Sequence, residues 1–163
     1  GQGGDAPRVD LDAGPLAARI VADLISTSLV RSAHDLSEGG LAVAAAEMAF
    51  GGGIGASIDL NKLPVVEATL DAPTRLFSET PSRYLIEVSA DVWATDAIQR
   101  RIEETTRAYN AERAKKNKPA ASVEWAQIGT TTETPNLSIS SGGKQLINEP
   151  VTGLRLAWTA AIQ

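Results

Sequence analysis

The run from Ala33 to Phe50 constrains the fold of this chain more than any other. It places the only histidine, His34, beside Asp35, and it continues with a hydroxyl at Ser37, a glycine pair at 39–40 and an alanine-rich apolar stretch. Polar residues at a strand end, then glycines, then a helix are the typical order of an α/β unit. The exposed amides at a helix start carry partial positive charge, so this loop suits an anion such as a phosphate or a metal-nucleotide.

Helical and strand periodicities flank this loop. Leu16, Ile20 and Leu24 recur every four residues and predict an amphipathic helix from Asp12 to Leu29. A short buried strand over 30–36 should end at His34 or Asp35. We then expect a helix over 40–50 stopped by the glycines at 51–53, a strand over 54–60, a polar linker containing Pro64 and Pro73, and a strand marked by Tyr84, Ile86 and Val88.

The second half of the chain predicts one long helix, short strands and a closing helix. Residues 91–117 lack proline and glycine, which favours a single helix. Strands are expected over 123–128, 136–140 and 144–147, with the last two joined as a hairpin, before a helix over 150–162. We therefore predict an α+β, layered α/β fold with helices on a mixed sheet, lacking strands that earlier residues would supply. Residues 1–14 should be a loop or linker, and 15–163 one domain.

Composition excludes several classes of function. The formal net charge of −5 argues against a nucleic-acid binder, which needs a basic face. No apolar run approaches the roughly 20 residues that span a bilayer. The chain has no cysteine, which fits a reducing, cytoplasmic compartment. It also begins without a methionine and with a loop-like segment, so we expect it to be part of a larger protein.

The loop residues allow two interpretations. In the first, Asp35 is a hard oxygen ligand for Mg²⁺, Ser37 hydrogen-bonds a phosphate, and Gly39 and Gly40 let a bulky anion approach the backbone. In the second, Ser37 or Glu38 caps the helix and His34 packs in the interior. Spacing alone leaves both open. Glu47 and Glu79 are more simply structural residues.

Basic residues gather in the predicted long helix. Acidic residues interrupt them, so a solvated helix face is the simpler interpretation and a contact surface the alternative. The seven are Arg100, Arg101, Arg107, Arg113, Lys115, Lys116 and Lys118.

Residues 34–41, followed by Ala-Glu-Met-Ala at 46–49, closely resemble a signature of the formylglycinamide ribonucleotide amidotransferase family, also called phosphoribosylformylglycinamidine synthase. The family pattern is His-Asp-x-Ser-Asp-Gly-Gly-Leu before an Ala-Glu-Met-Ala helix. Residues 76–86 are similar to its Phe-x-Glu-x-x-x-Arg segment, and residues 7–11 lead similarly into the first helix. Glu38 departs from the pattern, because the family more often has aspartate at this position. This departure leaves a metal role for Glu38 in doubt.

The resemblance implies an ATP-dependent ligase of purine biosynthesis. In that family the amide oxygen of formylglycinamide ribonucleotide is phosphorylated, and ammonia then displaces the phosphate to give the amidine. The chain looks like the last of four domains, with Mg²⁺ and ATP or ADP as cofactors. By this resemblance Asp35 is a Mg²⁺ ligand, and Ser37, Gly39 and Gly40 contact the nucleotide. The resemblance identifies no catalytic residue here, because the second-half site of large family members holds a structural nucleotide.

The resemblance also implies partners. Glutamine hydrolysis in the large, single-chain form uses a cysteine nucleophile, which this chain lacks. Ammonia would then come from a separate glutaminase subunit with a small bridging subunit, beside the remaining synthetase domains. A truncated large form is an alternative. So are a non-catalytic nucleotide-binding scaffold and a related enzyme, such as aminoimidazole ribonucleotide synthetase or selenophosphate synthetase.

Overall fold

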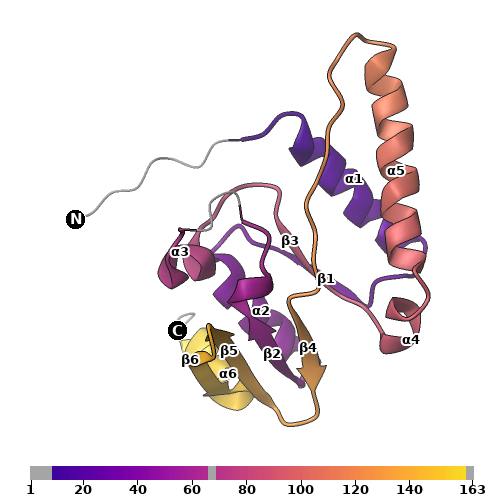
Figure 1. Cartoon of the computed structure of the whole chain (residues 1–163). Coiled ribbons are helices and arrows are strands. Elements are labelled where there is room, and N and C mark those ends of the chain that lie inside the picture. Colours follow the sequence, from indigo (N-terminus) through magenta and orange to yellow (C-terminus); the bar gives the residue numbers. More distant parts are fainter. Residues whose placement is uncertain (1–8, 66–68, 161–163) are drawn as a thin grey trace. The chain divides into compact units, whose positions relative to one another are not determined.

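The structure is a computed structural model that describes residues 9–65 and 69–160. Contacts divide the chain into two compact units (Figure 1). The first unit comprises Gly1–Ser37 and Glu79–Val123, and the second comprises Glu38–Ser78 and Glu124–Gln163. Most of the predicted opening loop lies outside the described residues. The expectation of one domain over 15–163 stays a prediction.

The first unit combines three helices with a two-stranded ladder. Its elements are α1 (Ala13–Ser26), β1 (Ser32–Asp35), β3 (Tyr84–Glu87), α4 (Ala90–Trp93) and α5 (Ala97–Ala114). The predicted stripe of Leu16, Ile20 and Leu24 is buried and forms a core with Ile98 and Ile102 of α5. Strands β1 and β3 run antiparallel, and Ile86 and Val88 pack against this core.

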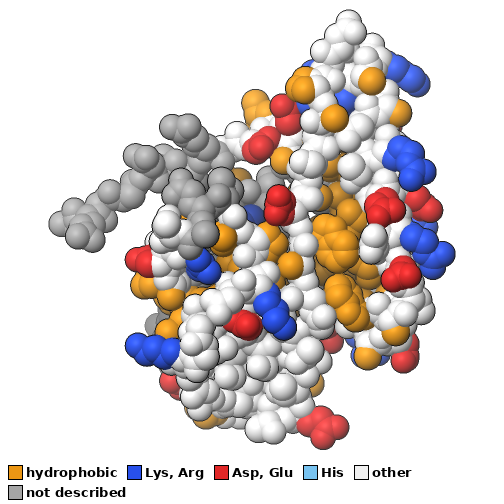
Figure 2. All heavy atoms as spheres, in the orientation of Figure 1, with side chains coloured by type: hydrophobic (Ala, Val, Ile, Leu, Met, Phe, Trp, Pro, Cys, Tyr) orange, Lys and Arg blue, Asp and Glu red, His pale blue; other side chains and the backbone are white. Residues whose placement is uncertain are grey.

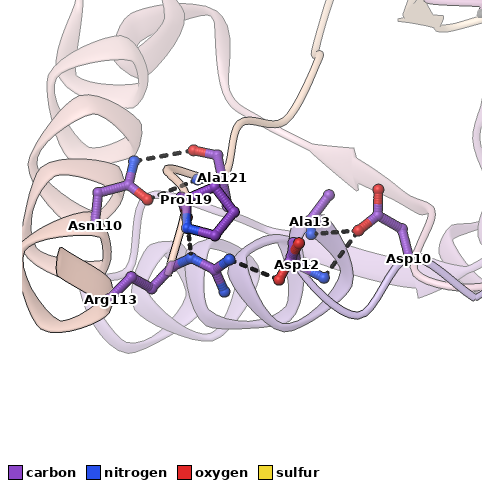
Figure 3. A network of polar contacts seen from close by, with 7 residues as sticks. All are labelled: Asp10, Asp12, Ala13, Asn110, Arg113, Pro119 and Ala121. Carbon is purple, nitrogen blue, oxygen red and sulfur yellow. Dashed lines mark hydrogen bonds and ion pairs between the residues drawn. The ribbon is translucent and has the colours of Figure 1, made fainter. Parts of the chain in front are cut away.

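A buried arginine near the end of α5 pairs with the residue that precedes α1 (Figure 3). The Arg113 side chain is 6% exposed. Its Nε donates to the carbonyl of Pro119 at 2.7 Å, and its guanidinium also donates to Asp12 Oδ1 at 2.6 Å. Buried charges persist when they are paired and hydrogen-bonded. The prediction that Arg113 belongs to a solvated face is therefore wrong, because a carboxylate far away in sequence pairs with it.

The rest of the α5 surface agrees with the predicted solvated face. Figure 2 shows positive and negative side chains interspersed along this helix, at the right of the view. Arg101 pairs with Glu104 at 3.4 Å, and Gln99 donates to Glu103 at 2.9 Å. Side-chain pairs three or four residues apart stabilise a helix by about a few tenths of a kcal/mol each.

The second unit is a four-stranded sheet with helices. Strands β2 (Gly55–Asp59) and β5 (Asn136–Ser141) are parallel neighbours, whereas β4 (Gly129–Thr132) and β6 (Lys144–Pro150) pair antiparallel at the two edges. The sheet order β4-β2-β5-β6 confirms the predicted mixed sheet. The remaining elements are α2 (Gly40–Gly52), the 3₁₀ turn η1 (Leu60–Lys62), α3 (Ala72–Phe77) and α6 (Val151–Ala160).

Three local predictions are wrong. The expected helix over 91–117 is two helices, α4 and α5, because Asp96 adopts a left-handed conformation with φ 48° between them. The expected strand over 123–128 does not form, and the ladder with β2 begins at Gly129, next to a hydrogen bond from the Asp59 amide to the Ile128 carbonyl. The linker before Phe77 contains helix α3, which the Asp71 side chain caps by accepting from the Thr74 amide. Apolar alternation does not report whether an extended segment finds a partner.

In the part of the chain that the structure describes, none of the helices has the length and apolar character that crossing a membrane requires.

Candidate nucleotide-binding loop

The predicted site residues lie on one continuous stretch that passes from the first unit to the second. Strand β1 ends at Asp35, the unit boundary follows Ser37, and α2 begins at Gly40. Asp35 and Ser37 are therefore described with the first unit, and Gly39 and Gly40 with the second.

The Asp35 carboxylate is exposed and held in its charged form. Its side chain is 57% exposed. A hydrogen bond from the Ser37 side chain lowers the pKa of Asp35 below its ordinary value, and the backbone and His34 add smaller effects in the same direction. An ionised carboxylate with a hydroxyl two residues away is the pair of oxygen-bearing groups that the sequence predicts for a metal-nucleotide.

His34 lies against the same residue. Its Nδ1 is 2.6 Å from the backbone carbonyl oxygen of Asp35 and 3.7 Å from Oδ1. A carbonyl can only accept, so Nδ1 carries the proton in this contact. The ring is partly buried, in keeping with the interpretation of His34 as a packed side chain.

The residues fit a magnesium ion only in part. Mg²⁺ is usually held by one or two carboxylates, with phosphate oxygens and water completing its shell. Asp35 offers one such oxygen ligand. Within 9–65 and 69–160, no group of three or more His, Cys, Asp or Glu side chains gathers where it could hold a metal. A metal at Asp35 would thus take its other ligands from a nucleotide, from water or from another part of the protein.

Both glycines at the start of α2 are required by the fold itself. Gly39 and Gly40 have φ values of 71° and 63°, a region that glycine enters without steric cost. A Cβ on Gly39 would lie 2.2 Å from the Val43 side chain. A Cβ on Gly40 would lie 2.7 Å from the carbonyl oxygen of Ser78 and 2.8 Å from that of Leu76. The backbone of the last residues of α3 and of its C-cap, Ser78, therefore packs directly onto Gly40.

The capping alternative stays a prediction beside the binding one. Gly39 is the N-cap residue of α2, and glycine has no side chain with which to cap the helix. The Ser37 side chain hydrogen-bonds the Asp35 carboxylate and thereby lowers the pKa of that group. The first amides of a helix have no partner within the helix, so they could serve an anion.

Glu47 has a structural partner. Its Oε1 accepts a hydrogen bond from the Trp158 indole at 2.9 Å, and the Trp158 ring lies 5.6 Å from that of Phe50. These contacts hold α6 on α2. Periodicity could not have found this pair, because the two residues are 111 positions apart.

Alternation in the sequence predicts Tyr84 only as part of a strand. The register of the β1–β3 ladder places it directly opposite Asp35. Its side chain is 37% exposed. No local signal marks this pairing, because the two residues come from strands separated by α2, β2 and α3.

Comparison with known proteins assigns the family. The model of the family "AIR synthase related protein, C-terminal domain" matches residues 1–141. Two curated relatives are phosphoribosylformylglycinamidine synthase subunits PurL. The one from Thermobifida fusca is 44% identical over 86 residues, which are 53% of this chain and 10% of the relative. The one from Alkaliphilus metalliredigens is 31% identical over 160 residues, which are 98% of this chain and 18% of the relative.

Solved structures show the same fold. Thermotoga maritima PurL complexed with FGAR superimposes with a TM-score of 0.68 at 21% identity, covering 90% of this chain and 21% of that protein. The same protein has also been solved with ATP, with ADP and as PurLQS. This chain spans about a tenth to a fifth of the curated relatives named above. The match over 1–141 nevertheless covers most of its length, and the chain therefore belongs to the family of AIR synthase related proteins, as a C-terminal domain of that family.

Proposed function

We propose that this chain is the C-terminal domain of the synthetase subunit of phosphoribosylformylglycinamidine synthase. The complete enzyme would convert formylglycinamide ribonucleotide, ammonia derived from glutamine, and ATP to the amidine, ADP and phosphate. The similarity to PurL subunits over 98% of the chain supports this assignment. The signature at 34–41, which lies within the aligned region, is the most specific part of that similarity.

The proposed role of this domain is to bind a magnesium-nucleotide. Asp35 would be the metal ligand, Ser37 would contact the nucleotide, and Gly39 and Gly40 would offer backbone amides. A bound Mg²⁺ would supply positive charge that offsets the charge of the phosphates. Ser37 would also hold the Asp35 carboxylate in its ionised, metal-binding form. The observation that supports this role most is the exposed Asp35 carboxylate with its hydrogen bond from Ser37.

The proposed partners follow from the same assignment. They are the remaining synthetase domains, a glutaminase subunit and a small bridging subunit, in the cytoplasm. The PurLQS structure of the Thermotoga maritima relative is the precedent for a multi-subunit assembly.

The experiment is a titration of the full-length protein with Mg–ADP, comparing wild type, Asp35→Asn and Glu38→Gln. Asp35→Asn removes the proposed ligand, so we expect affinity at one site to fall at least tenfold. Glu38→Gln removes a neighbouring charge and should bind like wild type. Equal affinity of Asp35→Asn and wild type would show that the metal assignment is wrong.

A second candidate is a scaffold whose nucleotide loop serves assembly rather than turnover. Its support is that both loop glycines already have packing roles. Asp35→Asn would then keep full ligase activity but weaken subunit association in sedimentation experiments. A related enzyme of the superfamily is the third candidate, and the sequence preceding Gly1 in the full-length protein would decide it.

A further inference from the structure

We infer that Tyr84 is an additional ligand-binding residue, whose phenol donates a hydrogen bond to a phosphate oxygen of a magnesium-nucleotide held at Asp35. This inference rests on the proposed function, because it takes Asp35 as the metal ligand.

The pairing of the strands brings the two side chains together. Asp35 and Tyr84 are directly opposite partners in the antiparallel β1–β3 ladder. The next pair is hydrogen-bonded, since the Leu36 amide donates to the Arg83 carbonyl at 3.1 Å. Pairs alternate along such a ladder, so Asp35 and Tyr84 form a non-hydrogen-bonded pair, the kind in which side chains approach most closely. Their Cβ atoms are thus expected to be about 4.5 to 5.5 Å apart, on one face.

Both side chains are open to a ligand. Asp35 is 57% exposed and Tyr84 is 37% exposed. The Ser37 hydroxyl bonds the same carboxylate, so three oxygen-bearing side chains gather at one end of the ladder. The apolar ring of a tyrosine with this exposure lies partly in water. A ligand that covers the ring would bury apolar surface, which favours binding.

The lengths of the side chains favour complementary roles. Asp35 would hold Mg²⁺ near the strand, because aspartate is short and carboxylate–Mg²⁺ bonds are only about 2.0 to 2.1 Å long. Tyrosine extends several ångströms further from its strand than aspartate does. Its phenol would therefore be suited to donate a hydrogen bond to a phosphate oxygen of a nucleotide on that metal.

The test compares Tyr84→Phe with Tyr109→Phe in the full-length protein. Tyr84→Phe removes only the phenol oxygen, so the strand keeps its aromatic ring. Tyr109 is the other tyrosine of the chain and lies on α5, with the guanidinium carbons of Arg19 and Arg113 at 6.0 and 5.7 Å from its ring centroid, which makes it a matched control away from Asp35. Mg–ADP affinity is measured by calorimetry, with Asp35→Asn and the double variant in the same series.

We expect Tyr84→Phe to weaken Mg–ADP binding about ten- to a hundredfold, as the loss of one hydrogen bond to a charged group should. The Tyr109→Phe protein should bind like wild type. In the Asp35→Asn background the Tyr84 substitution should cost less, because the two residues serve one ligand. Wild-type affinity of Tyr84→Phe, while Asp35→Asn binds weakly, would overturn this inference and leave the proposed function intact. Wild-type affinity of both variants would overturn both.

Discussion

The packing around Gly40 yields the sharpest prediction for stability, because two separate costs meet at one residue. Its φ of 63° places an alanine in the left-handed region, at about 1 to 2 kcal/mol. The new Cβ would also lie 2.7 to 2.9 Å from backbone atoms of Leu76, Phe77 and Ser78, which cannot rotate away. Overpacking of this kind typically costs about 1 to 3 kcal/mol.

The net expectation for Gly40→Ala is a loss of about 2 to 4 kcal/mol in the free energy of unfolding. It is slightly smaller than the two costs together, because alanine also restricts the unfolded chain by about 0.4 to 1 kcal/mol. Two glycines near the other end of α2 are internal controls. Gly53 has a φ of 66° but nothing within 4 Å of an added Cβ, so Gly53→Ala should lose only about 1 kcal/mol. Gly51 has neither constraint, and Gly51→Ala should gain about 0.5 to 1 kcal/mol.

The assay is equilibrium urea unfolding followed by tryptophan fluorescence. Trp93 and Trp125 are first replaced by phenylalanine, which leaves Trp158, on the helix that packs against α2, as the reporter of the second unit. If Gly40→Ala lost no more than Gly53→Ala, the close approach of the α3 backbone would not be energetically important. The series also separates a folding defect from a ligand defect, which matters for any nucleotide titration of Gly40 variants.

Two further predictions concern charged groups of the first unit and acid stability. Arg113→Met should clearly lower the melting temperature of the chain, because it removes the donor to the Pro119 carbonyl and the ion-pair partner of Asp12. Arg107→Met changes an exposed residue and should have little effect. An equal shift in the two variants would contradict the importance of the Arg113 contacts. The pKa values of Asp10 and Asp35 are lowered, mainly by hydrogen bonds from the Ala13 amide and the Ser37 side chain respectively. A carboxylate whose pKa is lower in the folded state stabilises the fold at pH values above its ordinary pKa of 3.8, and this stabilisation is lost as the pH falls through the folded-state pKa. The melting temperature should therefore fall mainly below about pH 4. It should fall less steeply in Asp10→Asn. A curve of unchanged steepness in Asp10→Asn would refute the contribution of that carboxylate.

The sequence predicted the elements that depend on local pattern. The stripe of Leu16, Ile20 and Leu24 predicted α1 and its buried face, and the glycines at 51–53 predicted the end of α2. The hairpin of β5 and β6 was equally readable from its glycine turn. Part of the candidate site was local too, because a hydroxyl two residues from a carboxylate needs no distant element to reach it.

The predictions that failed missed contacts between distant residues and one local change of backbone conformation. The sequence predicted Arg113 as an exposed charge, whereas the fold pairs it with Asp12, a carboxylate 101 positions away. The long helix was expected to continue through Asp96, where a left-handed residue divides it into α4 and α5. The glycine pair also did not reveal that the end of α3 and Ser78 pack against Gly40.

The sequence by itself determined α1 with its apolar face, the end of α2, the β5–β6 hairpin and the loop carrying Asp35 and Ser37. Periodicity and glycine placement encode these features, because each depends on neighbours within a few residues. Only the tertiary structure decided that Tyr84 stands opposite Asp35 and that backbone packs onto Gly40. Strand register and close backbone approach depend on which distant segments meet, and a local pattern does not specify that meeting.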